Sequence, residues 1–119
     1  KLVCYNVGNA PRDGAVAAAN LLKDETDRAE HFKEIRKVTR RIGRVRTALA
    51  RELEAPWMQN KSGLFVKLKP EGLSEEELQR LRGDQGLYTP RSSRLNLGGI
   101  PERLVGVVAA RISDALGKV

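Results

Sequence analysis

Cysteine, histidine and aromatic residues are all scarce in this 119-residue chain, and each shortage excludes a kind of site. The single cysteine, Cys4, cannot form an internal disulfide, and with one histidine, His31, the chain cannot build a metal site from paired cysteines and histidines. Aromatic residues make up 4% of the chain and provide no recognisable platform for stacking nucleic-acid bases. No apolar run approaches the ~20 residues of a membrane helix, so we expect no membrane partner.

Basic residues, in contrast, are abundant. Lysine and arginine number 22 against 15 acidic residues, which gives a net charge of +7. Many of them lie between residues 33 and 51, where a basic helix face could neutralise phosphates. Acidic residues interleave with them, so we prefer a solvated helix face. A non-enzymatic α+β module whose basic helix binds nucleic acid remains the alternative.

The first half of the chain is predicted to be mainly helical. After a strand-like start, residues 8–14 have turn chemistry and residues 15–22 favour a short helix. Asp24 or Thr26 is a candidate N-cap for a long helix over residues 25–53, whose apolar side chains recur at three- and four-residue steps from Phe32 onward. Because the chain begins with lysine rather than methionine, we expect it to be a piece of a longer protein.

The second half predicts short strands alternating with helices. Residues 64–69 favour a strand, and Ser74 with Glu77 forms a capping box for a helix that we expect to end at Gly83. Residues 86–90 and 94–97 are predicted to pair as a hairpin, followed by a terminal helix over residues 101–116. The predicted fold class is α+β, with one long helix and two or three shorter helices packed on a small sheet.

Arg94 is the candidate binding residue. It lies at the start of a predicted strand beside Ser92, Ser93 and Asn96, which could hold a guanidinium so that its planar fork donates to both oxygens of a carboxylate. From the residues alone, an ordinary surface arginine next to a turn is the competing interpretation.

The order of motifs resembles a known family. The segment "GLFVKLKPEGLSEEELQRLRGDQGLYTPRSSRLNLGGI" is similar to the C-terminal region of the class I aspartate and aromatic amino acid aminotransferases, in which "GMFSFTGL" and "SGRINVSGL" strands follow in that order. The earlier segment "GNAPRDGAVAAANLL" resembles the family's "SNPPAHGA" turn and the helix after it. The resemblance implies the small C-terminal domain of a fold-type I enzyme that uses pyridoxal 5'-phosphate (PLP).

The resemblance assigns roles to three residues. Arg94 corresponds to the arginine that binds the substrate α-carboxylate, Asn9 to the asparagine near the substrate, and Phe65 to the aromatic residue over the active site. Cys4 stands where aspartate aminotransferases carry the arginine for the side-chain carboxylate, which puts strict dicarboxylate specificity in doubt. No lysine here matches the context of the PLP lysine, so no catalytic or cofactor-binding residue is assigned, and we expect the chain alone to be inactive.

The resemblance also implies an organisation and a setting. Residues 1–24 would end the large-domain segment and form a connecting helix, and residues 25–119 would form the small domain. We expect a homodimeric enzyme, cytoplasmic or mitochondrial, that transfers an amino group between aspartate or an aromatic L-amino acid and 2-oxoglutarate. A diverged relative without activity is a further alternative.

Overall fold

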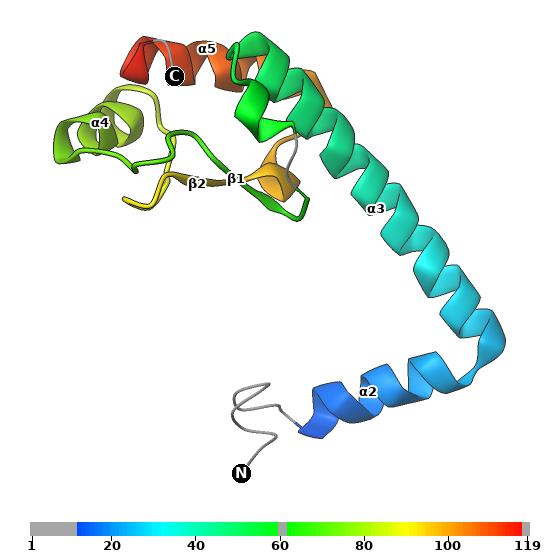
Figure 1. Ribbon diagram of the computed structural model, residues 1–119. Coiled ribbons are helices and arrows are strands. Elements are labelled where there is room, and N and C mark those ends of the chain that lie inside the picture. The colour runs from blue at the N-terminus through cyan, green and yellow to red at the C-terminus, as the bar shows by residue number, and fades with distance from the viewer. Residues whose placement is uncertain (1–11, 60–61, 118–119) are drawn as a thin grey trace. The chain divides into compact units, whose positions relative to one another are not determined.

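The structure, a computed structural model, describes residues 12–59 and 62–117. These residues form four α-helices and one two-stranded antiparallel sheet, so the predicted α+β class is confirmed (Figure 1). The chain divides into two compact units, Lys1–Val38 and Thr39–Val119. The boundary predicted after residue 24, between a large-domain segment and a small domain, concerns the domains of a complete enzyme and stays a prediction. Within the described ranges, no helix combines the length and the apolar character needed to cross a membrane.

The described part of the first unit consists of helix α2 (Arg12–Lys23) and the beginning of helix α3 (Glu25–Glu52). Asp24 separates the two helices because its Oδ1 accepts hydrogen bonds from the backbone N–H groups of Thr26 and Asp27, each at 2.9 Å. These bonds satisfy donors that the first turn of α3 leaves free. Of the two predicted candidates for the N-cap, Asp24 and Thr26, it is Asp24 that caps the long helix.

The apolar stripe predicted along α3 is buried only in its second half. Phe32, Ile35 and Val38 are between 43% and 49% exposed, whereas Val45 and Leu49 are at most 1% exposed. Each of the first three therefore leaves nearly half of its surface exposed. The second half of the stripe contributes to the core of the second unit.

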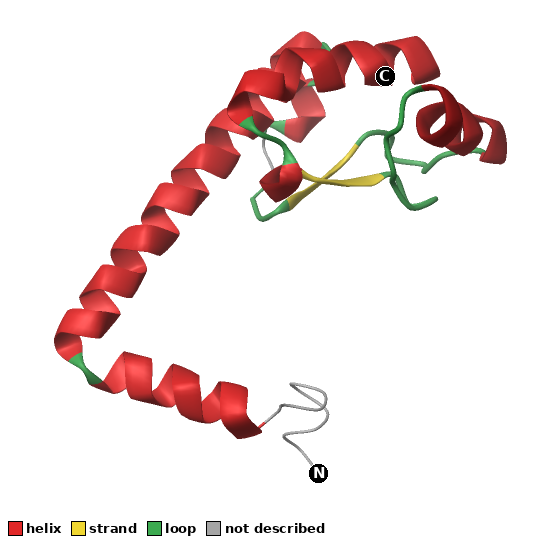
Figure 2. Ribbon diagram, turned by 180° about the vertical axis from the view of Figure 1, so that it is seen from behind, coloured by secondary structure: helices red, strands yellow, loops and turns green. Residues whose placement is uncertain are grey.

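That core forms where the C-terminal half of α3 packs against helix α5 (Val105–Leu116) and the strand pair (Figure 2). From α5, Ala109 and Ile112 are at most 2% exposed and belong to the same apolar cluster as Leu49. Burying a leucine or isoleucine side chain contributes about 1.5–3 kcal/mol. This packing gives the sheet a firm support.

The sheet pairs strand β1 (Phe65–Lys67) with strand β2 (Arg94–Asn96), so the predicted hairpin between residues 86–90 and 94–97 is wrong. The segment 86–90 is not a strand. Pro90 has no N–H for a ladder, and its carbonyl instead accepts the Ser93 N–H at 2.9 Å, which closes a tight turn. The strand that pairs with β2 is β1, which is separated from it in the sequence by a helix.

That helix, α4 (Glu75–Gln79), begins as predicted and ends differently. Ser74 and Glu77 form the capping box, with each side chain bonded to the other's backbone N–H. Gly83 is not the C-cap, because the helix widens into a π turn over Arg80–Asp84. The chain leaves at Gly86, whose φ of +64° favours glycine.

Candidate functional site

The strand pair places Arg94 on the face of the sheet that points away from the core. In the antiparallel register Lys67 lies opposite Arg94 and Phe65 lies opposite Asn96, and all four side chains are exposed. Val66 between them is 3% exposed and belongs to the core. The strand alternation therefore gathers an aromatic ring and two cations on one open face.

The guanidinium of Arg94 lies over the ring of Phe65, with 5.3 Å between its Cζ and the ring centroid. Within residues 12–59 and 62–117 it has no hydrogen-bond or ion-pair partner. A cation–π contact at an exposed site contributes about 0.5–1 kcal/mol and leaves the N–H groups at the ring edge free to donate. The arrangement holds the guanidinium and keeps its donor fork available for a carboxylate.

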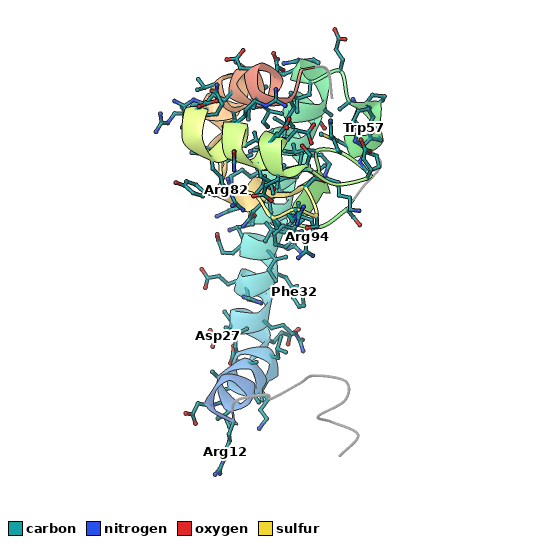
Figure 3. The ribbon with its side chains drawn as sticks, turned by 90° about the vertical axis from the view of Figure 1, so that its left-hand side faces the viewer. Arg12, Asp27, Phe32, Trp57, Arg82 and Arg94 are labelled. Carbon is teal, nitrogen blue, oxygen red and sulfur yellow. The ribbon has the colours of Figure 1, made fainter. Side chains whose placement is uncertain are left out.

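A cavity of about 390 Å³ opens beside this pair. Its walls come from the strand pair and from the turns before and after β1, and they are formed by Trp57, Ser62, Phe65, Val66, Lys67, Pro70 and Arg94. Figure 3 shows Arg94 at the strand pair and Trp57 at the turn after α3. Two of the wall residues are cationic and none is acidic, so the cavity suits an anionic ligand of small size.

Two donors in the cavity wall have capacity to spare. The Lys67 ammonium donates to the Pro70 carbonyl at 3.2 Å and has two further N–H groups. The indole Nε1 of Trp57 is buried and lacks an acceptor in the part of the chain that the structure describes. The Lys67 ammonium can therefore serve a bound ligand with acceptor oxygens, whereas the buried indole nitrogen is not accessible to one.

Ser93 fixes the backbone from which Arg94 projects. Its side chain is fully buried, and its Oγ donates to the Lys69 carbonyl at 2.5 Å and accepts from the Lys69 N–H at 3.3 Å. Its φ of +58° is a left-handed conformation that costs a non-glycine residue about 1–2 kcal/mol. On the other side, the Thr89 hydroxyl donates to the Arg94 carbonyl at 3.0 Å. The direction of Arg94 is thus set by buried bonds to its backbone and that of its neighbour.

The expectation that Ser92, Ser93 and Asn96 hold the guanidinium is wrong, because none of the three bonds to it. Ser93 bonds to the backbone of Lys69, and Asn96 Oδ1 accepts the Gly98 N–H at 2.9 Å to cap a short turn over Leu97–Gly99. Short polar side chains next to tight turns commonly bond to nearby backbone groups in this way. The ring of Phe65 supports the guanidinium in their place.

Two of the three predicted site residues, Arg94 and Phe65, are brought together by the fold. The third, Asn9, lies outside the described residues, as does Cys4. Lys67 and Trp57 were not predicted as parts of the site, and Ser93 was predicted in a different role, as a direct support of the guanidinium. The alternation in "FVK" puts Lys67 on the same face as Phe65, and this signal becomes usable once β1 is paired with β2.

An ion pair fastens the loop after β1 to helix α4. Lys69 Nζ lies 2.5 Å from Glu77 Oε1, and the two side chains are 23% and 14% exposed. The hydrogen bond from Lys69, followed by that from the Ser74 backbone, lowers the pKa of Glu77 below its usual value. The same lysine backbone bonds Ser93, so this contact also supports the site.

Several arginines of the basic stretch of α3 bind within the second unit. Arg41 donates to the carbonyls of Gly98 at 3.0 Å and Ile100 at 3.4 Å. Arg44 pairs with Glu102 at 2.8 Å, and this hydrogen bond lowers the pKa of the Glu102 carboxyl. These contacts fasten the chain after β2 to α3, which favours a structural use of the basic residues over a face reserved for nucleic acid.

Comparison with known proteins shows that this chain is similar to amino acid aminotransferases of the aspartate and aromatic type, so the resemblance inferred from the motifs is confirmed. The chain is 29% identical over 109 residues to the tyrosine aminotransferase of Rhizobium meliloti (strain 1021), which covers 87% of this chain and 27% of that protein. It is 26% identical over 113 residues to the aspartate aminotransferase of Escherichia coli (strain K12), covering 91% of this chain and 28% of that protein. No protein-family profile matches.

Solved structures agree. The aromatic amino acid aminotransferase of Burkholderia pseudomallei, solved with covalently bound pyridoxal phosphate, superposes with a TM-score of 0.74 at 26% identity, over 96% of this chain and 30% of that one. The chain spans between a quarter and a third of the length of the proteins it matches. This is consistent with a C-terminal portion of a class I PLP-dependent aminotransferase.

The described cavity does not fit PLP itself. The cofactor of such enzymes needs a lysine for its Schiff base and a carboxylate at its pyridine nitrogen. No aspartate or glutamate lines the cavity, and its only lysine, Lys67, bonds to the Pro70 carbonyl. This cavity is therefore not a complete site for the cofactor.

Proposed function

We propose that this chain is the C-terminal part of an amino acid aminotransferase, in which Arg94 binds the α-carboxylate shared by the amino acid and 2-oxo acid substrates. One observation carries the proposal: a guanidinium stacked on Phe65 lines a cavity with its donors unused by any described residue. Similarity to tyrosine and aspartate aminotransferases supports the class of reaction.

In this proposal Arg94 orients the substrate. Its planar fork donates two parallel hydrogen bonds to one carboxylate, which fixes the rotation of the Cα substituents relative to the reacting groups. Phe65 restricts the plane of the guanidinium, and with Trp57 it provides an apolar wall that excludes water and strengthens the charge interaction. PLP supplies the electron sink of the reaction, and its lysine belongs to the part of the enzyme that this chain does not span.

The proposed substrates are aspartate or an aromatic L-amino acid together with 2-oxoglutarate. The relatives act, by their names, on tyrosine and aspartate, which supports both amino acids as candidates. Asn9 is proposed to lie near the substrate, and the enzyme is proposed to be a homodimer. Nucleic acid and membranes have no place in this function.

Arg94→Lys in the full-length, PLP-loaded enzyme tests the proposal. Lysine keeps the charge and loses the fork, so the substrate carboxylate loses at least one charge-assisted hydrogen bond of about 1.5–3 kcal/mol. We expect kcat/KM for the amino acid to fall about 10- to 100-fold while the PLP absorbance is unchanged. Arg103→Lys is the matched control, because Arg103 is exposed and does not line the cavity. Equal kinetics for Arg94→Lys and the control, or a wild-type enzyme without transaminase activity, would contradict the proposal.

A further inference from the structure

Lys67 and Arg94 form a pair of like charges at opposing positions of the strand ladder. Their Cα atoms are register partners, both side chains are exposed on the same face, and both line the same cavity. Opposing residues of an antiparallel pair have Cβ atoms about 4.5–5.5 Å apart, and like charges at such positions destabilise a sheet. Across the described ranges, no carboxylate pairs with either cation.

The ammonium of Lys67 retains capacity for an anion. Its one acceptor is the neutral carbonyl of Pro70 at 3.2 Å, which uses one of three N–H donors and no charge. A neighbouring lysine, Lys69, is used differently, because it pairs with Glu77 at 2.5 Å. Of these two lysines, only Lys67 faces the cavity.

The other residues that line the cavity indicate which kind of ligand would fit beside the two cations. Trp57, Phe65 and Pro70 are largely apolar, so the ligand has a short carbon skeleton as well as charged ends. Lys67 and Arg94 are the two cationic residues of the wall, and both are exposed. Two anionic groups on a short chain match this arrangement better than one.

We propose that Lys67 binds a second carboxylate of the substrate and thereby makes the enzyme favour dicarboxylic over monocarboxylic substrates. This rests on the proposed function, in which Arg94 binds the α-carboxylate. In this arrangement Arg94 binds the α-carboxylate, which every amino acid carries. Lys67 binds the second carboxylate, which only acidic amino acids and dicarboxylic 2-oxo acids carry. Lys67 is a specificity residue of this site.

The test compares two inhibitors that share one carboxylate and differ at the other end. Succinate and 3-phenylpropionate are titrated by calorimetry into the full-length, PLP-loaded enzyme, and kcat/KM is measured for aspartate and phenylalanine. Lys67→Gln should weaken succinate binding and the aspartate reaction at least tenfold, with changes below threefold for 3-phenylpropionate and phenylalanine. Lys67→Arg, which keeps the charge, should restore most of the preference, and Arg103→Gln removes the same charge from a residue outside the cavity.

The outcomes separate this proposal from the proposed function. If Lys67→Gln weakens both ligands equally, Lys67 serves the shared carboxylate and the proposal is overturned. It is also overturned if neither ligand is affected. Arg94→Lys is measured alongside: unchanged binding of both ligands there refutes the role of Arg94, whatever Lys67→Gln shows. Because Lys67 is exposed, a thermal melt like that of the wild type confirms that the variant is folded.

Discussion

Replacing Ser93 with alanine should destabilise the second unit by about 1–3 kcal/mol. Ser93 is fully buried, and its Oγ makes hydrogen bonds of 2.5 Å and 3.3 Å to the Lys69 backbone. Leaving a buried backbone group without a partner costs about 1–3 kcal/mol, and alanine gains nothing in return because the left-handed φ of +58° still strains it. The loss of the two Ser93 Oγ hydrogen bonds is therefore not offset by any relief of backbone strain.

Ser93→Gly removes the same oxygen and relieves the backbone. The left-handed conformation costs about 1–2 kcal/mol for a residue with a Cβ, and glycine gives back about 0.5–1 kcal/mol of this as chain entropy. We therefore expect Ser93→Gly to be more stable than Ser93→Ala by about 0.5–1 kcal/mol, and less stable than the wild type. The order of the three proteins is as informative as the size of each change.

Urea denaturation of the chain, followed by the fluorescence of Trp57, measures these differences. Trp57 is the only tryptophan and packs against the core of the second unit, so it reports the unfolding of that unit. Ser92→Ala is the control, because Ser92 is exposed and its free energy of unfolding should change by less than about 0.5 kcal/mol. A Ser93→Ala variant as stable as this control, or a glycine variant less stable than the alanine variant, would refute the reasoning.

Two further predictions concern the supports of the site. Gly72→Ala should lower the free energy of unfolding by about 1–3 kcal/mol in the same urea assay, because φ at Gly72 is +98° and an added Cβ would meet the Arg91 carbonyl oxygen at 2.8 Å. The control is Gly83→Ala, since Gly83 has open space around it and a negative φ. Equal effects of the two substitutions would contradict this prediction. Glu77→Gln should destabilise the chain at pH 7 by about 1 kcal/mol or more, because the ion pair with Lys69 is lost while the amide oxygen can still accept the Ser74 N–H of the capping box. The folded-state pKa of Glu77 is lowered from 4.5, so its contribution to stability is present above pH 4.5 and is lost as the pH falls through the folded pKa. The free energies of unfolding of the wild type and of Glu77→Gln should therefore converge in acid. A difference between them that stays constant with pH would count against the role of the Glu77 carboxylate.

The helices could be predicted because their signals are local. Asp24 starts α3, and Ser74 with Glu77 starts α4, through bonds to residues two or three positions away. The stripe on α3 follows from the helical period alone. Which part of the stripe is buried does not follow from the helical period, because tertiary contacts decide that Val45 is 1% exposed and Phe32 is 46% exposed.

The strand pairing could not be read from neighbouring residues. Turn chemistry around Pro90 favoured a local hairpin, but the bonds of Ser93 and Arg91 go to the segment after β1, across a helix. Arg94 and Phe65 were found through the order of family motifs, in which each had its own place. Lys67 depends on the register with Arg94, which is a property of the tertiary structure.

The central claim is that the Arg94 guanidinium binds the substrate carboxylate, and a crystal structure of the full-length, PLP-loaded enzyme with a bound substrate analogue tests it most directly. The account predicts that the α-carboxylate of the analogue accepts two hydrogen bonds from Arg94, each about 2.7–2.9 Å long, beside the ring of Phe65. An analogue whose carboxylate is held by other residues, with the Arg94 guanidinium still bound to Phe65 alone, would contradict it.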